Sequence, residues 1–468
     1  MLRGLQALTL LISLGMSWPA SGQWTQFRGP NGSGVSASTG YPGEFSPSKN
    51  LLWKAAIPFG QSSPVVAGRL VFLTASEGDK LLTLAFDRAT GKEAWRREIV
   101  PERRHTIYRS NDPASPTPIA DDRGVVAFFP DFGLVAYDVN GKESWRHVMG
   151  PFHNFYGLAS SPIATGDRVI LVCDQQAGSF MVALDRATGR VVWKTDRREN
   201  TVGWATPIVF RPPSQPEQLV VLGSTRVDAY DAASGEPRWW FPVGSQGSLG
   251  TPVMSSDMVL VSTLATSEPF LPDFGAVLAK YDRDGNTLIS ADEFKTDGMT
   301  DHFGWIDGNS DGAINRDEWS AARSIDRGEF GAVAVRPGTG RGRLSPAAFA
   351  WRFQKNLPFV AAPLVYQDVF YMVRDGGIIT SLDAATGKLL KEGRTREALG
   401  EYFASPIAAD GKVFLASGEG KITVLRAAAQ WDVLGVNDMG GEIRATPALS
   451  GGRIYVRTRD ALYCFGTQ

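Results

Sequence analysis

This chain has few cysteines, few histidines and almost no net charge. Only two cysteines, Cys173 and Cys464, occur among 468 residues, and both lie in apolar runs, so we expect buried free thiols rather than a disulfide. The four histidines are too scattered to indicate a metal cluster. The net charge is −1, so no overall field draws the chain to nucleic acid or to an anionic membrane.

The motifs of common enzyme classes are missing as well. The sequence holds no G-x-S-x-G, no H-E-x-x-H and no C-x-x-C pattern. Glycine and tryptophan are abundant instead, at 51 and 13 residues. Many turns together with many tryptophans favour an all-β repeat protein.

Residues 1–22 are typical of a signal peptide. Arg3 supplies the positive start, Leu5 to Met16 is apolar but too short to span a bilayer, and Ala20 to Gly22 offers small residues at a cleavage position. Gln23, and not a cysteine, stands directly after this position, so no lipid anchor is indicated. We therefore expect a periplasmic or secreted chain that begins at Gln23, with no transmembrane segment in its mature part.

One marker recurs eight times: a small or hydroxyl-bearing residue, then proline, then an apolar strand. Proline fits the first residue of a strand, where its missing N–H costs no ladder bond. The interval from Pro252 to Pro363 is about twice the others, which indicates an insertion. The marker prolines are Pro64, Pro118, Pro162, Pro207, Pro252, Pro363, Pro406 and Pro447.

A second marker lies between the prolines: Asp, a turn that ends in Gly, then a strand with Trp. It runs from Asp87 to Trp95 and from Asp185 to Trp193, for example. Asp bonds forward to the turn, Gly supplies a positive φ, and Trp can fill the space between neighbouring sheets. The period of about 45 residues, with about four strands each, predicts an all-β fold, an eight-bladed β-propeller. A β-sandwich or solenoid is the alternative.

The two ends of the chain complement each other. The final strand, Ala461 to Phe465, stands at a third-strand position, and Leu51 to Ile57 carries Trp53 where an outer strand would. We therefore predict that the N-terminal strand closes the eighth blade, which removes exposed sheet edges. The propeller would span residues 51–468, and residues 23–50 would form an N-terminal extension.

The repeat from Ala183 to Trp193 resembles that of the PQQ-like, or quinoprotein-like, propeller family. This family includes quinone-dependent alcohol dehydrogenases and BamB, the propeller lipoprotein of the outer-membrane β-barrel assembly machinery. The opening from Gln26 to Gly32 and the ending from Asn437 to Arg457 look like an exported bacterial branch. The resemblance covers about residues 24–468 and implies the fold more than any activity.

The resemblance implies two alternative functions. The dehydrogenases of the family hold the quinone PQQ over the propeller axis beside a calcium ion, and they typically have a disulfide between adjacent cysteines. Cys173 and Cys464 are not adjacent, which argues against PQQ and against a quinoprotein oxidoreductase. The missing anchor cysteine argues against a close match to the barrel-assembly subunit. The sequence favours a non-enzymatic role and leaves catalysis open.

Residues 267–328 interrupt the fifth blade and contain two acidic twelve-residue loops. The second, Asp307 to Glu318, satisfies the EF-hand pattern at every constrained position. In the first, Asp282 to Glu293, Thr287 replaces the usual glycine, so we expect weaker binding. Calcium takes about seven oxygen ligands. The predicted ligands are Asp282, Asp284, Asn286, Leu288, Ser290, Glu293, Asp307, Asn309, Asp311, Ala313, Asn315 and Glu318.

The surroundings of these loops support a paired arrangement. Ile289 and Ile314 occupy matching positions and are predicted to form a short β bridge. Apolar residues at helical spacing predict a small core between short helices. The alternative is an acidic surface turn or a decayed pair of loops. The core residues are Val277, Leu278, Phe294, Phe303, Ile306 and Trp319.

The loops before the marker prolines are expected to converge on one face of the propeller. Their polar and aromatic side chains suggest a funnel that binds a ligand or a peptide of an envelope protein, or else residues that only form turns. The candidates are Asn111, Asp112, His153, Asn154, Trp204, Tyr402 and Arg444, with Gln61 and Tyr156 in the same loops. We therefore expect a calcium-binding exported scaffold or interaction module of the cell envelope.

Overall fold

The computed structural model describes residues 22–104, 111–244, 249–264, 271–294, 302–308, 311–326 and 330–467. The predicted signal peptide, apart from Gly22, lies outside the described residues. Among the described residues, no helix is both long enough and apolar enough to cross a membrane.

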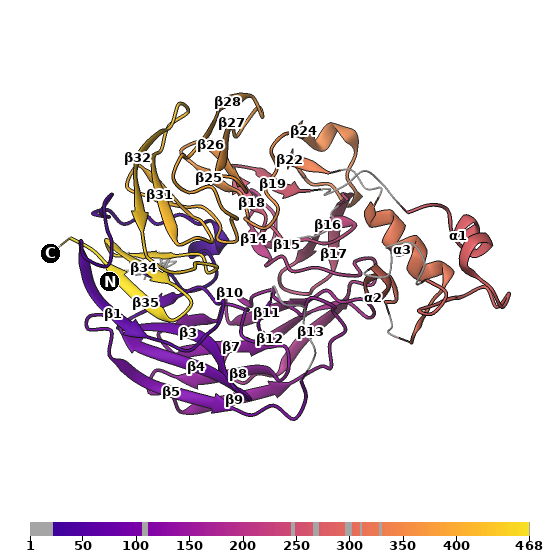
Figure 1. The fold of residues 1–468 in the computed structure, drawn as a ribbon, viewed down its shortest axis with the longest axis horizontal. Coiled ribbons are helices and arrows are strands. Elements are labelled where there is room, and N and C mark those ends of the chain that lie inside the picture. The colour runs from indigo at the N-terminus through magenta and orange to yellow at the C-terminus, as the bar shows by residue number, and fades with distance from the viewer. Residues whose placement is uncertain are drawn as a thin grey trace, which may run out of the picture.

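In this part of the chain, eight antiparallel sheets surround a central axis (Figure 1). The prediction of an eight-bladed propeller is confirmed. Blades one to three consist of β2 (Val65–Ala67), β3 (Leu70–Glu77), β4 (Lys80–Asp87) and β5 (Glu93–Ile99), then β6 (Ile119–Asp121), β7 (Gly124–Phe129), β8 (Gly133–Asp138) and β9 (Glu143–Val148), then β10 (Ile163–Thr165), β11 (Arg168–Cys173), β12 (Phe180–Asp185) and β13 (Val191–Asp196).

Blades four and five are linked to each other. The connection between the last two strands of blade five holds β23 (Gly342–Arg343) and the 3-10 turn Pro346–Ala348, and β23 pairs in parallel with the outer strand of blade four. The two blades consist of β14 (Ile208–Phe210), β15 (Gln218–Leu222), β16 (Arg226–Asp231) and β17 (Pro237–Pro242), then β18 (Val253–Ser255), β19 (Met258–Thr263), β22 (Gly331–Val335) and β24 (Phe349–Phe353).

The last blade contains both the first and the last strand that the structure describes. β1 (Leu51–Ala56) pairs antiparallel with β35 (Ala461–Phe465), and Trp53 lies opposite Cys464. The predicted closure by the N-terminal strand is therefore confirmed. The remaining strands of blades six to eight are β25 (Leu364–Tyr366), β26 (Val369–Arg374), β27 (Ile378–Asp383) and β28 (Leu389–Arg394), then β29 (Ile407–Ala409), β30 (Lys412–Ala416), β31 (Lys421–Arg426) and β32 (Asp432–Asp438), then β33 (Ala448–Ser450) and β34 (Arg453–Arg457).

The Asp–Gly marker forms the turn between the third and fourth strands of a blade. In blade one, the Asp87 carboxylate accepts the backbone N–H of Thr90 at 2.9 Å and its hydroxyl at 2.8 Å. Gly91 has φ +71°, a conformation that L side chains rarely adopt. The same bonds recur at Asp185 and Asp383, so one local sequence sets the same hairpin in several blades.

Five tryptophans of the outer strands each join their blade to the next. The ring packs on the turn glycine of the following blade, where a Cβ would lie only 2.5–2.7 Å away, and four of the indoles donate to the carbonyl beside that turn at 3.0–3.1 Å. Only glycine leaves room for this contact. The pairs are Trp53 with Gly91, Trp95 with Gly141, Trp145 with Gly189, Trp193 with Gly235 and Trp351 with Gly387.

The proline markers form a second set of contacts, nearer the axis. The residue before proline donates its backbone N–H to the hydroxyl of the equivalent residue in the next blade, at 2.9–3.1 Å. This explains why a hydroxyl precedes the proline in most blades. The bonds run from Ser63 to Thr117, Thr117 to Ser161, Ser161 to Thr206, Ala362 to Ser405 and Ser405 to Thr446.

The N-terminal extension lies against the innermost strands. Its backbone and side chains bond to the middle residue of the first strand in several blades, so it lines the axis and not the outer rim. It includes the short 3-10 turn η1 (Pro30–Gly32). The bonded pairs are Trp24 with Val66, Thr25 with Ala120, Gln26 with Ala164, Asn31 with Val209 and Gly34 with Ala408.

Candidate metal centre and loop face

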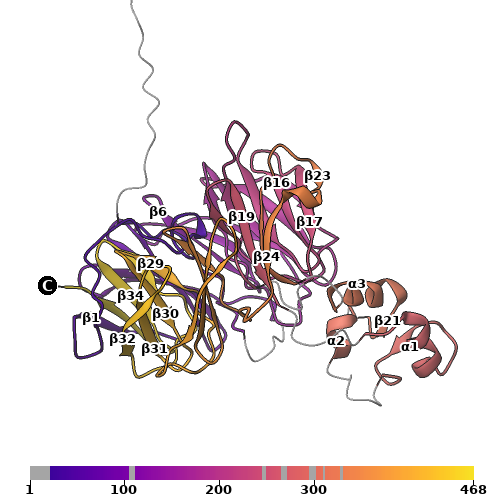
Figure 2. The ribbon, with the colours of Figure 1, turned by 90° about the horizontal axis from the view of Figure 1, so that it is seen from above.

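The insertion between β19 and β22 contains, among its described residues, three short helices, and it stands outside the ring of blades (Figures 1 and 2). Val277, Phe294, Ile306 and Trp319 are buried together, and Leu278 and Phe303 pack against them. All six residues of the predicted helical core therefore meet. The helices are α1 (Phe274–Tyr281), α2 (Phe303–Ile306) and α3 (Arg316–Asp326).

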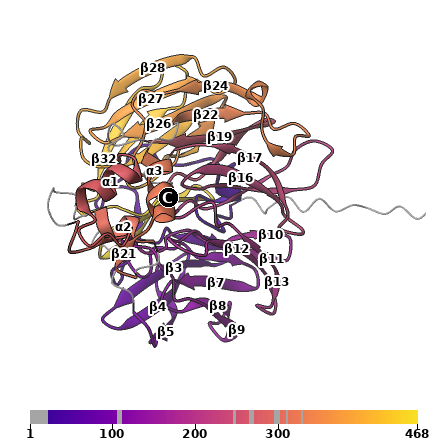
Figure 3. The same cartoon turned by 90° about the vertical axis from the view of Figure 1, so that its right-hand side faces the viewer.

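The two acidic loops lie side by side. The strands β20 (Ile289–Ser290) and β21 (Ala313–Ile314) form a two-stranded sheet in which Ile289 lies opposite Ile314, as predicted. Both isoleucines are fully buried. Figure 2 shows β21 between α2 and α1, and Figure 3, which faces this side of the molecule, shows the same three elements in front of the blades.

The first loop gathers carboxylates around its own backbone. Ligand oxygens of Asp282, Asp284 and Glu293 lie within 4.8 Å of one another. Asp282 accepts the N–H of Thr287 at 3.0 Å, and Glu293 accepts the N–H of Ser290 at 2.8 Å. These and further backbone bonds lower the pKa of Glu293 to about 2, so its carboxylate is ionised at neutral pH.

The sixth position of the first loop is conformationally unusual. Thr287 has φ +64°, and Gly312, its counterpart in the second loop, has φ +88°. A threonine in this region is strained because its Cβ approaches the backbone. The expected departure from the EF-hand pattern thus coincides with a left-handed residue that bears a branched side chain.

The second loop repeats the bonding of the first. Asp307 accepts the N–H of Gly312 at 3.0 Å, and Glu318 accepts the N–H of Asn315 at 2.9 Å. Asp311 accepts the N–H of Ala313 at 2.9 Å. The predicted ligand Asn309 lies outside the described residues. The donor set of both loops, carboxylates with amide or hydroxyl oxygens and a carbonyl, is the chemistry that calcium prefers.

The insertion leaves blade five but contacts blade three. The Gln176 side chain, in the loop between β11 and β12, donates to the carbonyls of Gly304 at 2.7 Å and Asp307 at 3.3 Å. Asp307 is the first residue of the second acidic loop. The position of this loop is therefore tied to a loop of the propeller two blades away.

A buried charge network anchors that same propeller loop. The Arg197 guanidinium is fully buried and donates to both carboxylate oxygens of Asp174 at 2.8 Å, and to the Tyr230 hydroxyl at 2.7 Å. Asp228 lies 3.4 Å from the same guanidinium and accepts from Asn200 at 2.9 Å. No sequence motif indicates this network, because its members come from three separate segments of the chain.

The face that carries the loops before the marker prolines, here called the loop face, brings some predicted residues together. Asn111, Asp112 and Asn154 line one recess between blades two and three. Asn111 donates to the carbonyl of Tyr156 at 2.7 Å. Asp112 accepts from Ser76 at 3.0 Å, and burial raises the pKa of its carboxyl. These polar groups serve mainly to join adjacent loops.

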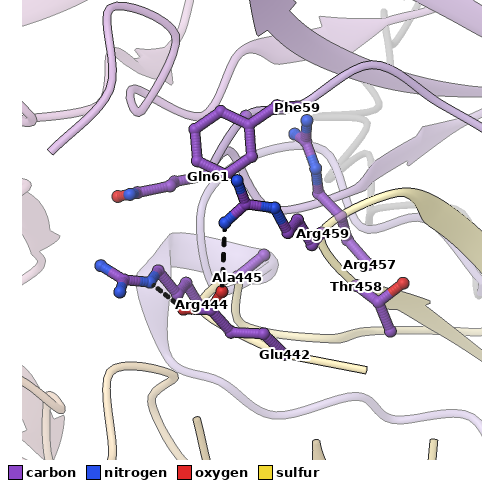
Figure 4. A pocket seen from close by; sticks show the side chains of 9 residues that line it. Phe59, Gln61, Glu442, Arg444, Ala445, Arg457, Thr458 and Arg459 are labelled. Carbon is purple, nitrogen blue, oxygen red and sulfur yellow. Dashed lines mark hydrogen bonds and ion pairs between the residues drawn. The ribbon is translucent and has the colours of Figure 1, made fainter. Parts of the chain in front are cut away.

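A second recess lies at the seam between blades eight and one (Figure 4). It is lined by the predicted residues Gln61 and Arg444. Glu442 pairs with Arg444 at 2.6 Å and with Arg459 at 3.6 Å. No sequence motif indicates the other lining residues, because isolated arginines in a strand or turn do not predict a recess. They include Phe59, Glu442, Arg457, Thr458 and Arg459.

The other predicted residues of the loop face are dispersed. The Trp204 indole donates to the carbonyl of Gly157 at 2.8 Å and its ring contacts Tyr156. Tyr402 is 1% exposed and donates to the carbonyl of Ala398 at 2.8 Å, so it is a packing residue of its blade. His153 is exposed and bonds through its backbone to Gln175. The seven candidates thus do not form a single funnel-shaped site.

Solved structures share the fold at low identity. BamB from Moraxella catarrhalis has 14% identity and a TM-score of 0.55, over 89% of this chain and 97% of that chain. A europium-containing methanol dehydrogenase has 11% identity and a TM-score of 0.51, over 96% of this chain and 99% of that chain. A quinohemoprotein alcohol dehydrogenase from Comamonas testosteroni has 12% identity and a TM-score of 0.51, over 95% of this chain and 80% of that chain.

The sequence matches a protein family but no individual curated protein. A search among curated proteins gives no significant match. The family described as outer membrane protein assembly factor BamB matches residues 44–203 and 177–467, which together span most of the chain and all eight blades. The chain therefore belongs to the family of the outer membrane protein assembly factor BamB.

Proposed function

We propose that this protein is a calcium-binding propeller that acts as a scaffold or interaction module of the cell envelope. The observation that carries the calcium proposal is the repeated bonding of the two acidic loops. In both, the first carboxylate accepts the N–H of the sixth residue at 3.0 Å, and the last accepts the N–H of the ninth at 2.8–2.9 Å. This shared bonding supports the proposal that each loop binds a calcium ion.

The envelope role is supported by family membership and by the sequence of residues 1–22. A propeller with many surface loops and no motif of a common enzyme class suits binding better than catalysis. We infer that partners are proteins or peptides of the envelope that contact the loop face. Purification from native envelopes with and without calcium, followed by identification of the bound proteins, tests this part of the proposal.

Glu318→Gln should abolish calcium uptake by the second loop. The substitution removes a charge and the bidentate geometry of the last ligand. We expect the wild-type loop to bind with a Kd of roughly 10⁻⁴–10⁻³ M, as in extracellular modules. Calorimetric titration of the full chain measures the number of sites and their affinities. Asp317→Asn, which removes a neighbouring exposed charge that is not a predicted ligand, is the matched control. Absence of any heat of binding at millimolar calcium in the wild type would contradict the proposal.

Thr287→Gly should strengthen calcium binding by the first loop. Holding threonine at φ +64° costs about 1 kcal/mol or more. This strain weakens calcium binding, because the bound loop must adopt the strained conformation. Its removal should raise the affinity about 5- to 10-fold. Thr287→Ser keeps a Cβ at the same position and should change the affinity little. An equal gain in both variants would show that backbone strain is not the cause.

Quinone-dependent oxidation is the alternative function, and we expect the protein to lack it. The predicted calcium ligands lie in a peripheral insertion, whereas quinone chemistry needs a metal at a quinone carbonyl and a base within reach. The assay is alcohol and sugar oxidation with an artificial acceptor after incubation with quinone and calcium. Turnover that is lost in Asp112→Asn or His153→Ala, yet survives Glu318→Gln, would place catalysis on the loop face.

A further inference from the structure

The side chain of Arg28 lies inside the ring of blades. It belongs to the N-terminal extension and is completely buried. Its backbone has φ +59°, and its carbonyl accepts the N–H of Gly34 at 2.8 Å. The chain thus adopts a tight, glycine-rich loop in an uncommon conformation to hold this residue at the axis.

The positive charge of Arg28 lacks a counterpart. Its Nη2 donates to the carbonyl of Pro363 at 2.6 Å, whereas Nε and Nη1 are buried and have no hydrogen-bond partner in the part of the chain that the structure describes. Among the described residues, no carboxylate forms an ion pair with it. Burial lowers the pKa of Arg28 to about 9, so the group still carries its charge at neutral pH.

The other fully buried arginines show how this fold normally compensates such a charge. Arg197 is held by Asp174 and Asp228. Arg457 donates through Nη1 and Nη2 to the backbone or hydroxyl oxygens of Ser62, Thr74 and Pro58, although its Nε also has no partner among the described residues, and Asp112 lies near enough to raise its pKa against the effect of burial. A buried charge without a partner is strongly unfavourable, so the Arg28 guanidinium requires a negatively charged group beside it.

In residues 24–29, the buried side-chain atoms without a hydrogen-bond partner are all donors. Besides Nε and Nη1 of Arg28, the indole N–H of Trp24 is buried without a partner, and its ring lies against Gly29, the neighbour of Arg28. A water molecule accepts only two hydrogen bonds and must donate its own, whereas an anion accepts several and neutralises the charge. We propose that a small inorganic anion of the halide class binds Arg28 inside the ring and holds the N-terminal extension in place.

Bromide is the probe for this site, because it scatters anomalously and replaces chloride. Crystals of the full mature chain grown in sodium bromide should show an anomalous peak beside Nε and Nη1 of Arg28. In solution, the melting temperature should rise by roughly 1–3 °C for each tenfold increase in bromide above its Kd. Sodium gluconate, whose anion is too large to be enclosed, should give no such rise at equal ionic strength.

Arg28→Met should remove the bromide-specific rise in melting temperature. Arg457→Met, which removes another buried arginine, should lower the melting temperature and keep the rise. If either variant fails to fold, the anomalous map of the wild type decides. Bromide peaks on the surface only, water beside Arg28, or an equal response to bromide and gluconate would each overturn the proposal.

Discussion

Trp53→Ala should lower the free energy of unfolding by about 3–5 kcal/mol, the usual loss for a buried tryptophan. Trp53 is 7% exposed, its strand pairs with β35, and its ring packs on Gly91 of blade one. Its indole also donates to the carbonyl of Arg88 at 3.1 Å. The substitution therefore weakens the contact at which the ring closes. Chemical denaturation of the mature chain measures the loss.

The same change elsewhere provides the control. Trp193 packs on Gly235 in the same way, but it is only partly buried and its indole N–H has no partner, so Trp193→Ala should cost less. Deletion of residues 23–57 removes the whole closing strand and should produce association through the exposed edge of β35. A truncated chain that stays monomeric with an unchanged melting temperature would contradict the closure argument.

Arg197→Met should destabilise the protein by about 3–5 kcal/mol, because it leaves the buried Asp174 carboxylate without its arginine and leaves Asp228 with only Arg226 as an ion-pair partner. The side-chain exposures of Arg197, Asp174 and Asp228 are 0%, 1% and 4%, so water cannot replace the lost bonds. The loop that carries Gln176 should also loosen, since Asp174 holds it. Denaturation measures the first effect, and hydrogen exchange around residues 174–179 measures the second.

Arg198→Met is the matched control for this prediction. Arg198 is the next residue in the chain and pairs with Asp196, but its side chain is 77% exposed. Exposed ion pairs contribute about 0–1 kcal/mol. A loss in Arg197→Met no larger than that in Arg198→Met would show that the buried network contributes little to stability.

The fold was predictable because its signals are local and repeated. Asp87, Gly91 and Trp95 each act within a few residues or on the next blade, and this unit recurs along the chain. The paired loops of the insertion were predictable for the same reason, since an EF-hand pattern is contiguous. The match of Ile289 with Ile314 followed from equal positions in two such loops.

The loop face was not predictable to the same degree. Tyr402 and Trp204 come from equivalent loops, yet Tyr402 donates to the carbonyl of Ala398 and Trp204 donates to the carbonyl of Gly157. The seam recess and the Arg197 network join residues far apart in sequence, and their partners depend on how blades are placed around the axis. Arg28 gave no signal, because a single arginine in a glycine-rich segment resembles an exposed turn.

The pairing of β1 with β35 also determines when the protein can finish folding. During synthesis β1 is made before the strands of the other seven blades and β35 is made after them, so β1 has no partner while those blades are formed. Bringing such distant segments together has an entropic cost that is paid before their contacts are gained, and contacts between them slow folding. Until the last strand arrives, an open ring exposes two unpaired edges and is prone to aggregate. The completed ring is therefore a late state, and factors that protect the unpaired β1 would govern its yield.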